Sequence, residues 1–193
     1  MSEIERLYTD FVKGREQQDT RRFLTSVRHK STRYINHKNR EYLNFSSNDY
    51  LGLSHHPALI QRAQEWAEEY GAGSGASRLV TGNIEPFETI ENKIATFKGK
   101  EAALVMPSGF QTNASVLPAL FDPSILGNEP LVFSDKLIHA SMHAGCAAAK
   151  IKQIRFRHND VSHLKELLEK YADEKRPRFI LIETVYSMDG DIA

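Results

Sequence analysis

The tripeptide Ser108-Gly109-Phe110 is a candidate binding site for a phosphate group. It follows the apolar run Ala102–Met106 and opens a helix-like segment, Gln111–Leu117. A strand that turns into a helix at small residues leaves several backbone N–H groups without partners. These groups and the positive end of the helix dipole attract a phosphate. The residues alone leave two interpretations open, a phosphate site or an ordinary turn between a strand and a helix.

Two polar side chains also lie just beyond apolar runs. His139 comes after Leu131–Ser134, and Ser187 comes after Arg178–Ile182. A histidine at the start of a helix is often a capping or surface residue, and the residues around Ser187 are typical of a turn. A structural role therefore stays open for both. Their shared position with Gly109, each after a predicted strand, favours a functional one.

These segments belong to a regular alternation of strands and helices. The predicted strands are Ala102–Met106, Leu131–Ser134, Lys152–Phe156 and Arg178–Ile182, and the predicted helices between them are Gly109–Leu120, Ser141–Ala149 and Val161–Tyr171. Strands that alternate with helices of this length predict an α/β fold with a mainly parallel sheet. Ligands of such folds bind beyond the carboxyl ends of the strands.

The residues before this alternation predict a helical and hairpin segment followed by two helices. Glu3–Gln18 is weakly amphipathic, and Arg33–Asn36 and Glu41–Phe45 read as two strands. Helices are predicted to start at Pro57 and Pro86, because proline is favoured in the first turn of a helix.

Composition limits the classes of function. The chain has 193 residues, of which 40% are hydrophobic and 26% charged, as in ordinary globular proteins. Its formal net charge of +0 favours neither nucleic acid nor an anionic membrane as a partner. The single cysteine, Cys146, reads as a small buried residue. With no apolar stretch long enough to span a bilayer, a cytoplasmic protein is expected.

No metal site is expected. The eight histidines are scattered along the sequence. There is neither a cysteine pair nor a His-Glu-x-x-His pattern, the spacings that are typical of zinc sites.

Five motifs together resemble the α-oxoamine synthase family. They are Asn44–Leu53, Gly71–Gly75, Ser108–Phe110, the segment from Ser134-Asp135 to His139-Ala140-Ser141, and Ser187–Asp191. Members of this family are enzymes that depend on pyridoxal 5'-phosphate (PLP) and have the aspartate-aminotransferase fold, fold type I. The resemblance extends from about Arg21 onward. It implies a mainly parallel-sheet major domain and a homodimer with active sites at the subunit interface.

The resemblance also implies roles for individual residues. The implied cofactor-binding residues are Gly109, Phe110, Ser187 and His139. The implied substrate-binding residues are Arg22, Asn48 and His139. His139 is the implied catalytic residue, which stacks on the cofactor ring and faces the substrate. Glu183 is expected either to support a site residue or to have a structural role.

The implied reaction is a decarboxylative condensation of L-alanine with a pimeloyl thioester, as in the biotin-pathway members of the family. Other members use glycine or serine with other acyl thioesters. A glycine C-acyltransferase, a synthase of acyl signal molecules and an inactive module therefore remain alternatives.

One departure from the family pattern bears on activity. The family needs a Schiff-base lysine and an aspartate that pairs with the pyridine nitrogen, and both follow the Ser-Met-Asp-Gly-Asp motif. The chain ends at Ala193, and none of its lysines lies in a matching motif. We expect residues 1–45 to form an arm and residues 46–193 the first part of the major domain, with the rest of that domain and the C-terminal domain absent. Alone, this chain is expected to be inactive.

Overall fold

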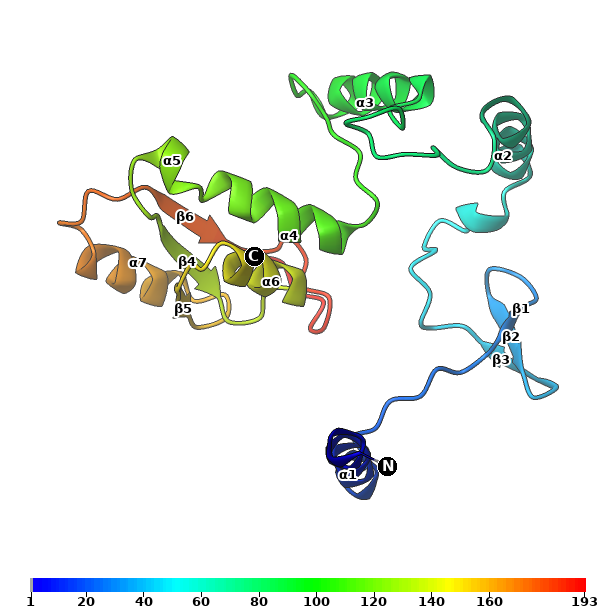
Figure 1. The fold of residues 1–193 in the computed structure, drawn as a ribbon, viewed down its shortest axis with the longest axis horizontal. Helices are drawn as coiled ribbons and strands as arrows, with labels where there is room; N and C mark the ends of the chain where they lie inside the picture. The colour runs from blue at the N-terminus through cyan, green and yellow to red at the C-terminus, as the bar shows by residue number, and fades with distance from the viewer. Residues whose placement is uncertain (1) are drawn as a thin grey trace. The chain divides into compact units, whose positions relative to one another are not determined.

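The computed structural model describes residues 2–193, which fall into two compact units that meet in sequence between Ile84 and Glu85 (Figure 1). The predicted division into an arm of residues 1–45 and a major-domain part of residues 46–193 stays a prediction. Among the described residues, no helix has the length and apolar character needed to cross a membrane.

The first unit contains two long helices and a small antiparallel sheet. Its elements are α1 (Glu3–Gln17), β1 (Arg28–His29), β2 (Tyr34–His37), β3 (Arg40–Leu43), η1 (Leu53–His55) and α2 (Pro57–Tyr70). Helix α1 begins with a capping box, because the side chains of Ser2 and Glu5 each accept the other residue's backbone N–H. The predicted hairpin forms as β2 and β3, and β1 adds a third strand that was not expected.

The second unit is an α/β unit built on a parallel sheet, as predicted. Its elements are α3 (Glu85–Lys98), α4 (Gly109–Leu120), α5 (Pro123–Leu126), β4 (Leu131–Asp135), α6 (Ala140–Ala148), β5 (Gln153–Phe156), α7 (Val161–Lys170) and β6 (Arg178–Leu181). The strand order is β5-β4-β6, and both pairs are parallel. The central strand β4 is buried along its whole length, as expected for a strand covered on both faces.

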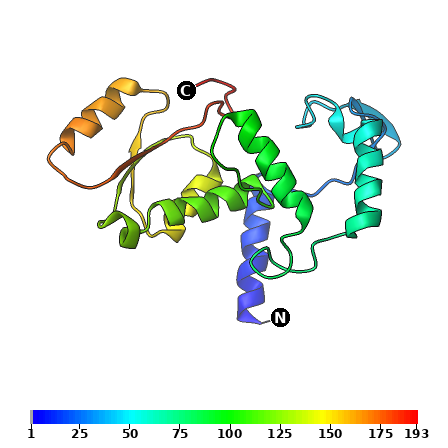
Figure 2. The ribbon, with the colours of Figure 1, turned by 90° about the horizontal axis from the view of Figure 1, so that it is seen from above.

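Helices cover both faces of this sheet. Because side chains alternate along a strand, Val132 and Phe133 point to opposite faces. Val132 packs in one apolar cluster with Leu117 of α4 and Cys146 of α6. Phe133 packs in another with Leu164 and neighbouring residues of α7. Figure 2 shows α7 on one side of the strands and α4 on the other. The strands are therefore packed between helices on both faces.

One predicted strand does not form. Residues 102–106 make no ladder with another strand among residues 2–193, although they were expected to begin the sheet. Apolar character favours a strand, but a strand exists only where a second backbone pairs with it. The Val105 N–H instead donates to Glu91 Oε1 of α3 at 2.7 Å. The segment therefore leads into α4 as irregular chain.

Candidate functional site

His139 lies beyond the end of β4 and begins α6. It is the N-cap residue of that helix, with non-helical backbone angles, and the residue is exposed. Its Nδ1 accepts the backbone N–H of Ser141 at 3.2 Å, and the hydroxyl of Ser141 lies 2.7 Å from the same nitrogen. A nitrogen that accepts from a backbone N–H carries no proton, so Nε2 carries the proton of the neutral ring. His139 therefore presents an N–H donor away from its helix.

A side chain from α4 extends this arrangement. Asn113 Nδ2 donates to the hydroxyl of Ser141 at 2.9 Å, and Ser141 is fully buried. Ser141 thus links α4 to the ring of His139. Asn113 is one helical turn after Gly109 and lies on the same face of α4. The N-termini of α4 and α6 are consequently neighbours at one edge of the sheet.

Glu183 ties β6 to the same edge. Its carboxylate accepts the backbone N–H of His139, so a residue just beyond β6 fixes the backbone at the start of α6. Of the two roles expected for Glu183, the hydrogen bond favours support of a candidate site residue. A carboxylate at the beginning of a helix also interacts favourably with the positive end of the helix dipole.

The N-terminus of α4 has the features expected of an anion site. Ser108 is the N-cap, and its hydroxyl accepts the N–H of Gln111 at 3.1 Å. Within residues 2–193, the N–H groups of Gly109 and Phe110 have no acceptor. A Cβ placed on Gly109 would meet no atom within 4 Å, and Ser108, Gly109 and Phe110 are all exposed. Two N–H groups and the dipole of a 12-residue helix therefore face open space.

Ser187 lies in a tight hairpin that follows β6. Gly190 N–H donates to Tyr186 O at 2.8 Å, Tyr186 N–H donates to Asp191 O at 3.0 Å, and Val185 pairs with Ile192. Ser187 is exposed within this turn. The hairpin thus lies beyond the carboxyl end of β6, as His139 lies beyond the carboxyl end of β4.

A buried aspartate organises the loops at this edge. Asp135, the last residue of β4, is completely buried, and its carboxylate accepts the N–H groups of Leu137 and Asn159, each at 2.8 Å. It also contacts the His158 ring at 2.9 Å. Burial alone would raise the pKa of Asp135, but these N–H groups and the ring outweigh it and lower the pKa below its ordinary value. Asp135 is therefore a carboxylate at neutral pH.

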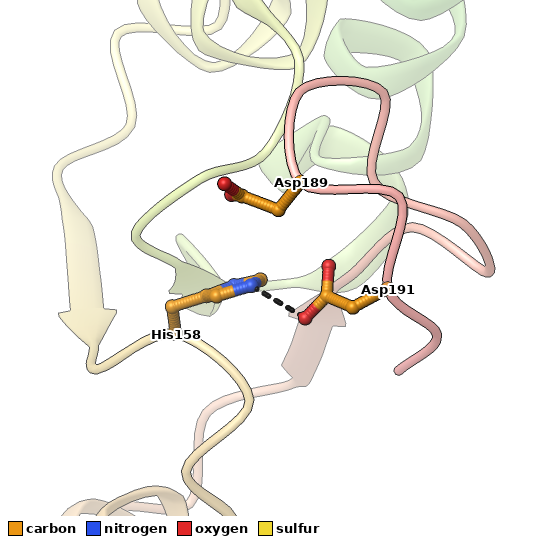
Figure 3. Close-up of side chains that lie close together, drawn as sticks. All are labelled: His158, Asp189 and Asp191. Atoms are coloured by element: carbon orange, nitrogen blue, oxygen red, sulfur yellow. Dashed lines mark hydrogen bonds and ion pairs between the residues drawn. The ribbon is translucent and has the colours of Figure 1, made fainter.

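His158 joins Asp135 to the Ser187 hairpin. Its Nε2 lies 2.9 Å from Asp191 Oδ2, and Figure 3 shows that Asp189 and Asp191 approach the ring from the same hairpin. The ligand atoms of these three residues lie within 4.8 Å of one another, close enough for a metal site. Both ring nitrogens, however, already face carboxylates. We therefore interpret the group as a hydrogen-bond network.

The structure brings some of the predicted residues together and leaves others apart. His139 and Ser187 lie beyond the ends of neighbouring strands, and Gly109 and Phe110 begin the helix that packs beside α6. Arg22 and Asn48 are exposed residues of the first unit, and their part in the site stays a prediction. The roles assigned to all six stay predictions.

Sequence reasoning missed three residues that organise the site. Asn113 and Ser141 orient His139, and His158 connects two strand ends. His158 could have been found, because it follows the predicted strand Lys152–Phe156 and strand ends were already the place to search. No signal in the sequence marked the contact between Asn113 and Ser141, which depends on how two helices pack.

Comparison with known proteins identifies the family of this chain. The family described as aminotransferase class I and II matches residues 40–193. An 8-amino-7-oxononanoate synthase of Gluconacetobacter diazotrophicus is 55% identical over 143 residues, which is 73% of this chain and 36% of that protein. The chain spans about half the length, or less, of the curated relatives that it matches, even where all of it aligns.

Two solved structures are similar in fold. Serine palmitoyltransferase from S. paucimobilis, with bound PLP–myriocin aldimine, matches 100% of this chain and 48% of its own chain at 23% identity and a TM-score of 0.83. An 8-amino-7-oxononanoate synthase from Francisella tularensis matches 77% of this chain and 38% of its own at 28% identity and a TM-score of 0.60. The first likeness establishes the fold alone.

Proposed function

Because the chain belongs to the class I and II aminotransferase family and to its α-oxoamine synthases, we propose that the whole protein is an 8-amino-7-oxononanoate synthase. Its reaction would be the decarboxylative condensation of L-alanine with a pimeloyl thioester, either pimeloyl-CoA or a pimeloyl-carrier protein, in biotin biosynthesis. The observation that carries this proposal is the 55% identity over 143 residues to an enzyme of that name.

The proposed cofactor is pyridoxal 5'-phosphate. The open turn at the start of α4 fits its phosphate, because the N–H groups of Gly109 and Phe110 are free to donate and the helix dipole favours an anion. The exposed ring of His139 fits a stacking partner for a flat aromatic group, and Ser187 offers a hydroxyl from the next strand end. When bound, PLP supplies the electron sink that makes the α-proton of an amino acid acidic.

The role proposed for His139 follows from its hydrogen bonds. Nδ1 is occupied by Ser141, so the ring keeps one orientation and directs its Nε2–H outward. An N–H held in place is suited to bind the carbonyl or carboxylate oxygen of a substrate without reorganisation. Asn113 and Glu183 hold this geometry from two other elements. Arg22 and Asn48 are proposed to bind the substrate.

A homodimer is proposed as the working form. The exposed apolar side of α1 supports it: Ile4, Leu7 and Phe11 each expose more than half of their surface. Light scattering on the whole protein would test this, and a monomer would contradict it. A cytoplasmic location stays a prediction.

The decisive assay measures release of the free thiol when the PLP-loaded whole protein receives L-alanine and pimeloyl-CoA. Glycine and L-serine, and palmitoyl-CoA as the thioester, are tested in parallel. Turnover that prefers L-alanine and the pimeloyl chain is expected. A preference for glycine or serine would contradict the proposal and favour another α-oxoamine synthase.

A pair of histidine variants on α6 tests the assigned role. His139→Phe keeps a flat ring but removes the Nε2–H, so we expect PLP affinity to be largely kept while kcat/KM falls about 10²-fold. His143→Gln is the matched control, because His143 lies on the same helix and its ring nitrogen contacts Gln153, at 2.9 Å, instead of a candidate site residue. Equal losses in both variants would contradict a specific role of His139.

A further inference from the structure

The network around His158 connects three segments that follow three different strands. Asp135 ends β4, His158 follows β5, and Asp191 belongs to the hairpin that follows β6. The ring of His158 is the only side chain among residues 2–193 that bonds to both aspartates. In Figure 3 the ring lies beneath the hairpin, with its dashed contact to Asp191. The contacts of His158 with Asp135 and Asp191 therefore connect the sheet to the hairpin, and we call this connection the tie.

The sheet end of this tie is rigid. Asp135 is completely buried, and two backbone N–H groups hold its carboxylate in addition to the His158 ring. A buried carboxylate with several donors has one favourable orientation. Asp135 therefore fixes the position of the imidazole relative to β4.

The hairpin end holds the base of the turn that carries Ser187. Asp191 Oδ2 accepts from both His158 Nε2, at 2.9 Å, and Asn159 Nδ2, at 2.6 Å. Asn159 Nδ2 also donates to Ile192 O at 3.2 Å. Asp191 O in turn accepts the N–H of Tyr186. The two neighbouring side chains from the β5 loop thus hold the strand of the hairpin that closes the Ser187 turn.

The charge of the ring decides whether both contacts can be hydrogen bonds. A neutral imidazole has one N–H, so it can donate to only one of two carboxylates, whereas an imidazolium donates to both. The hydrogen bond to Asp135 raises the pKa of His158 most, burial opposes it, and the bond and charge of Asp191 raise it further. The other groups that face the ring are Asp189 and Tyr186, whose ring centroid lies 4.5 Å from that of His158 at an interplanar angle of 88°.

We propose that His158 is a positioning residue: as an imidazolium between Asp135 and Asp191, it holds the hairpin that carries Ser187 in place at the carboxyl edge of the sheet. The structural tie stands on the geometry alone. Its consequence for PLP binding rests on the proposed function, in which Ser187 contacts the cofactor. The Ser187 hairpin is then expected to be held while the ring is protonated, and to loosen as the pH rises through the pKa of His158.

The tie is tested first without any cofactor, in the 193-residue chain. Two-dimensional ¹H–¹⁵N spectra of the imidazole should show both ring nitrogens of His158 protonated at about pH 6.5, with a titration midpoint above the ordinary value of about 6.5. Asp191→Asn keeps an acceptor but removes one charge, so the midpoint should fall. A single protonated nitrogen at that pH, or a midpoint that Asp191→Asn leaves unchanged, would overturn the proposal.

Amide hydrogen exchange then reports on the hairpin itself. In His158→Gln, the amides of residues 183–193 should exchange about tenfold faster after correction for intrinsic rates, because a charge-assisted contact to the turn is lost. His163→Gln is the matched control: His163 lies five residues on and accepts the N–H of Arg157 outside the network. If His158→Gln does not fold, Asp191→Asn carries the same test, since it leaves the contact between Asp135 and His158 in place. Unchanged exchange would overturn the tie.

The role in cofactor binding is tested by spectroscopic titration of the whole protein with PLP. His158→Gln should raise the dissociation constant of PLP by about tenfold, and His163→Gln should leave it unchanged. Faster hairpin exchange with unaltered PLP affinity would overturn the positioning role. A wild-type protein that binds PLP but does not use L-alanine would refute the proposed reaction and leave these measurements valid, so the two failures are distinguishable.

Discussion

Gly145 of α6 packs tightly against α4, and replacing it with alanine tests how these two helices support the candidate site. A Cβ at Gly145 would lie 2.5 Å from the carbonyl oxygen of Asn113 and 3.0 Å from Leu117 Cβ and Cδ1. A backbone oxygen cannot rotate away as a side chain can. Gly145→Ala must therefore push the two helices apart or distort one of them.

The sign of the effect follows from two opposing contributions. Alanine in place of glycine within a helix stabilises it by about 1 kcal/mol. Overpacking of a close-packed interior costs about 1–3 kcal/mol, and a clash with backbone belongs in the upper part of that range. We expect Gly145→Ala to destabilise the second unit by about 1–2 kcal/mol. Gly14→Ala in α1 is the control, because a Cβ there meets no atom within 4 Å and the residue lies in the first unit, so the stability of the second unit should not change.

The single cysteine provides the assay. Cys146 is next to Gly145, is completely buried, and has a pKa raised by burial, so its thiol reacts only when the second unit opens. Labelling Cys146 in increasing urea gives the unfolding midpoint of this unit. With a slope of about 1–2 kcal/mol per molar, Gly145→Ala should lower the midpoint by about 1 M. A midpoint that is unchanged or higher would refute the argument from close approach.

Three further predictions concern the same edge of the sheet. Ser141→Ala removes the link between Asn113 and His139, so it should lower kcat/KM of the whole protein about tenfold. The free energy of unfolding from Cys146 labelling in urea should stay within about 1 kcal/mol of wild type. Glu183→Gln keeps an oxygen that accepts the His139 N–H, whereas Glu183→Ala does not. Titrations of the whole protein with PLP should show a larger loss of PLP affinity for Glu183→Ala. Equal losses of affinity in the two variants would contradict the hydrogen-bond role. The pKa of Asp135 is lowered in the folded state. Its contribution to stability is therefore present above the ordinary pKa of an aspartate, about 4, and is lost as the pH falls through the lower pKa of the folded state. Urea midpoints measured from about pH 6 to about pH 3 should fall more steeply for wild type than for Asp135→Asn.

The succession of helices and strands in the second unit could be predicted because each has a local signature. Helix α4 forms over Gly109–Leu120 as expected, since a serine cap precedes it, and β4 forms at the buried apolar run that begins at Leu131. The segment 102–106 has the same apolar character as β4 but no pairing partner among residues 2–193. Strand formation depends on a second segment, which composition alone does not reveal.

The edge of the sheet that carries the candidate site could be predicted, but the contacts between its side chains could not, and the strand order explains why. The chain order of the strands is β4, β5, β6, whereas the sheet order is β5-β4-β6, so β4 has both of the others as neighbours. Residues at the end of β4 or beyond it can therefore contact residues that follow either strand: Asp135 meets His158, and His139 meets Glu183. Had β5 been central, β4 and β6 would lie two strands apart, about 10 Å at the usual spacing of strands, and His139 could not contact Glu183. The rule that ligands bind at strand ends selects the edge, and the order of the strands decides which side chains can act together on it.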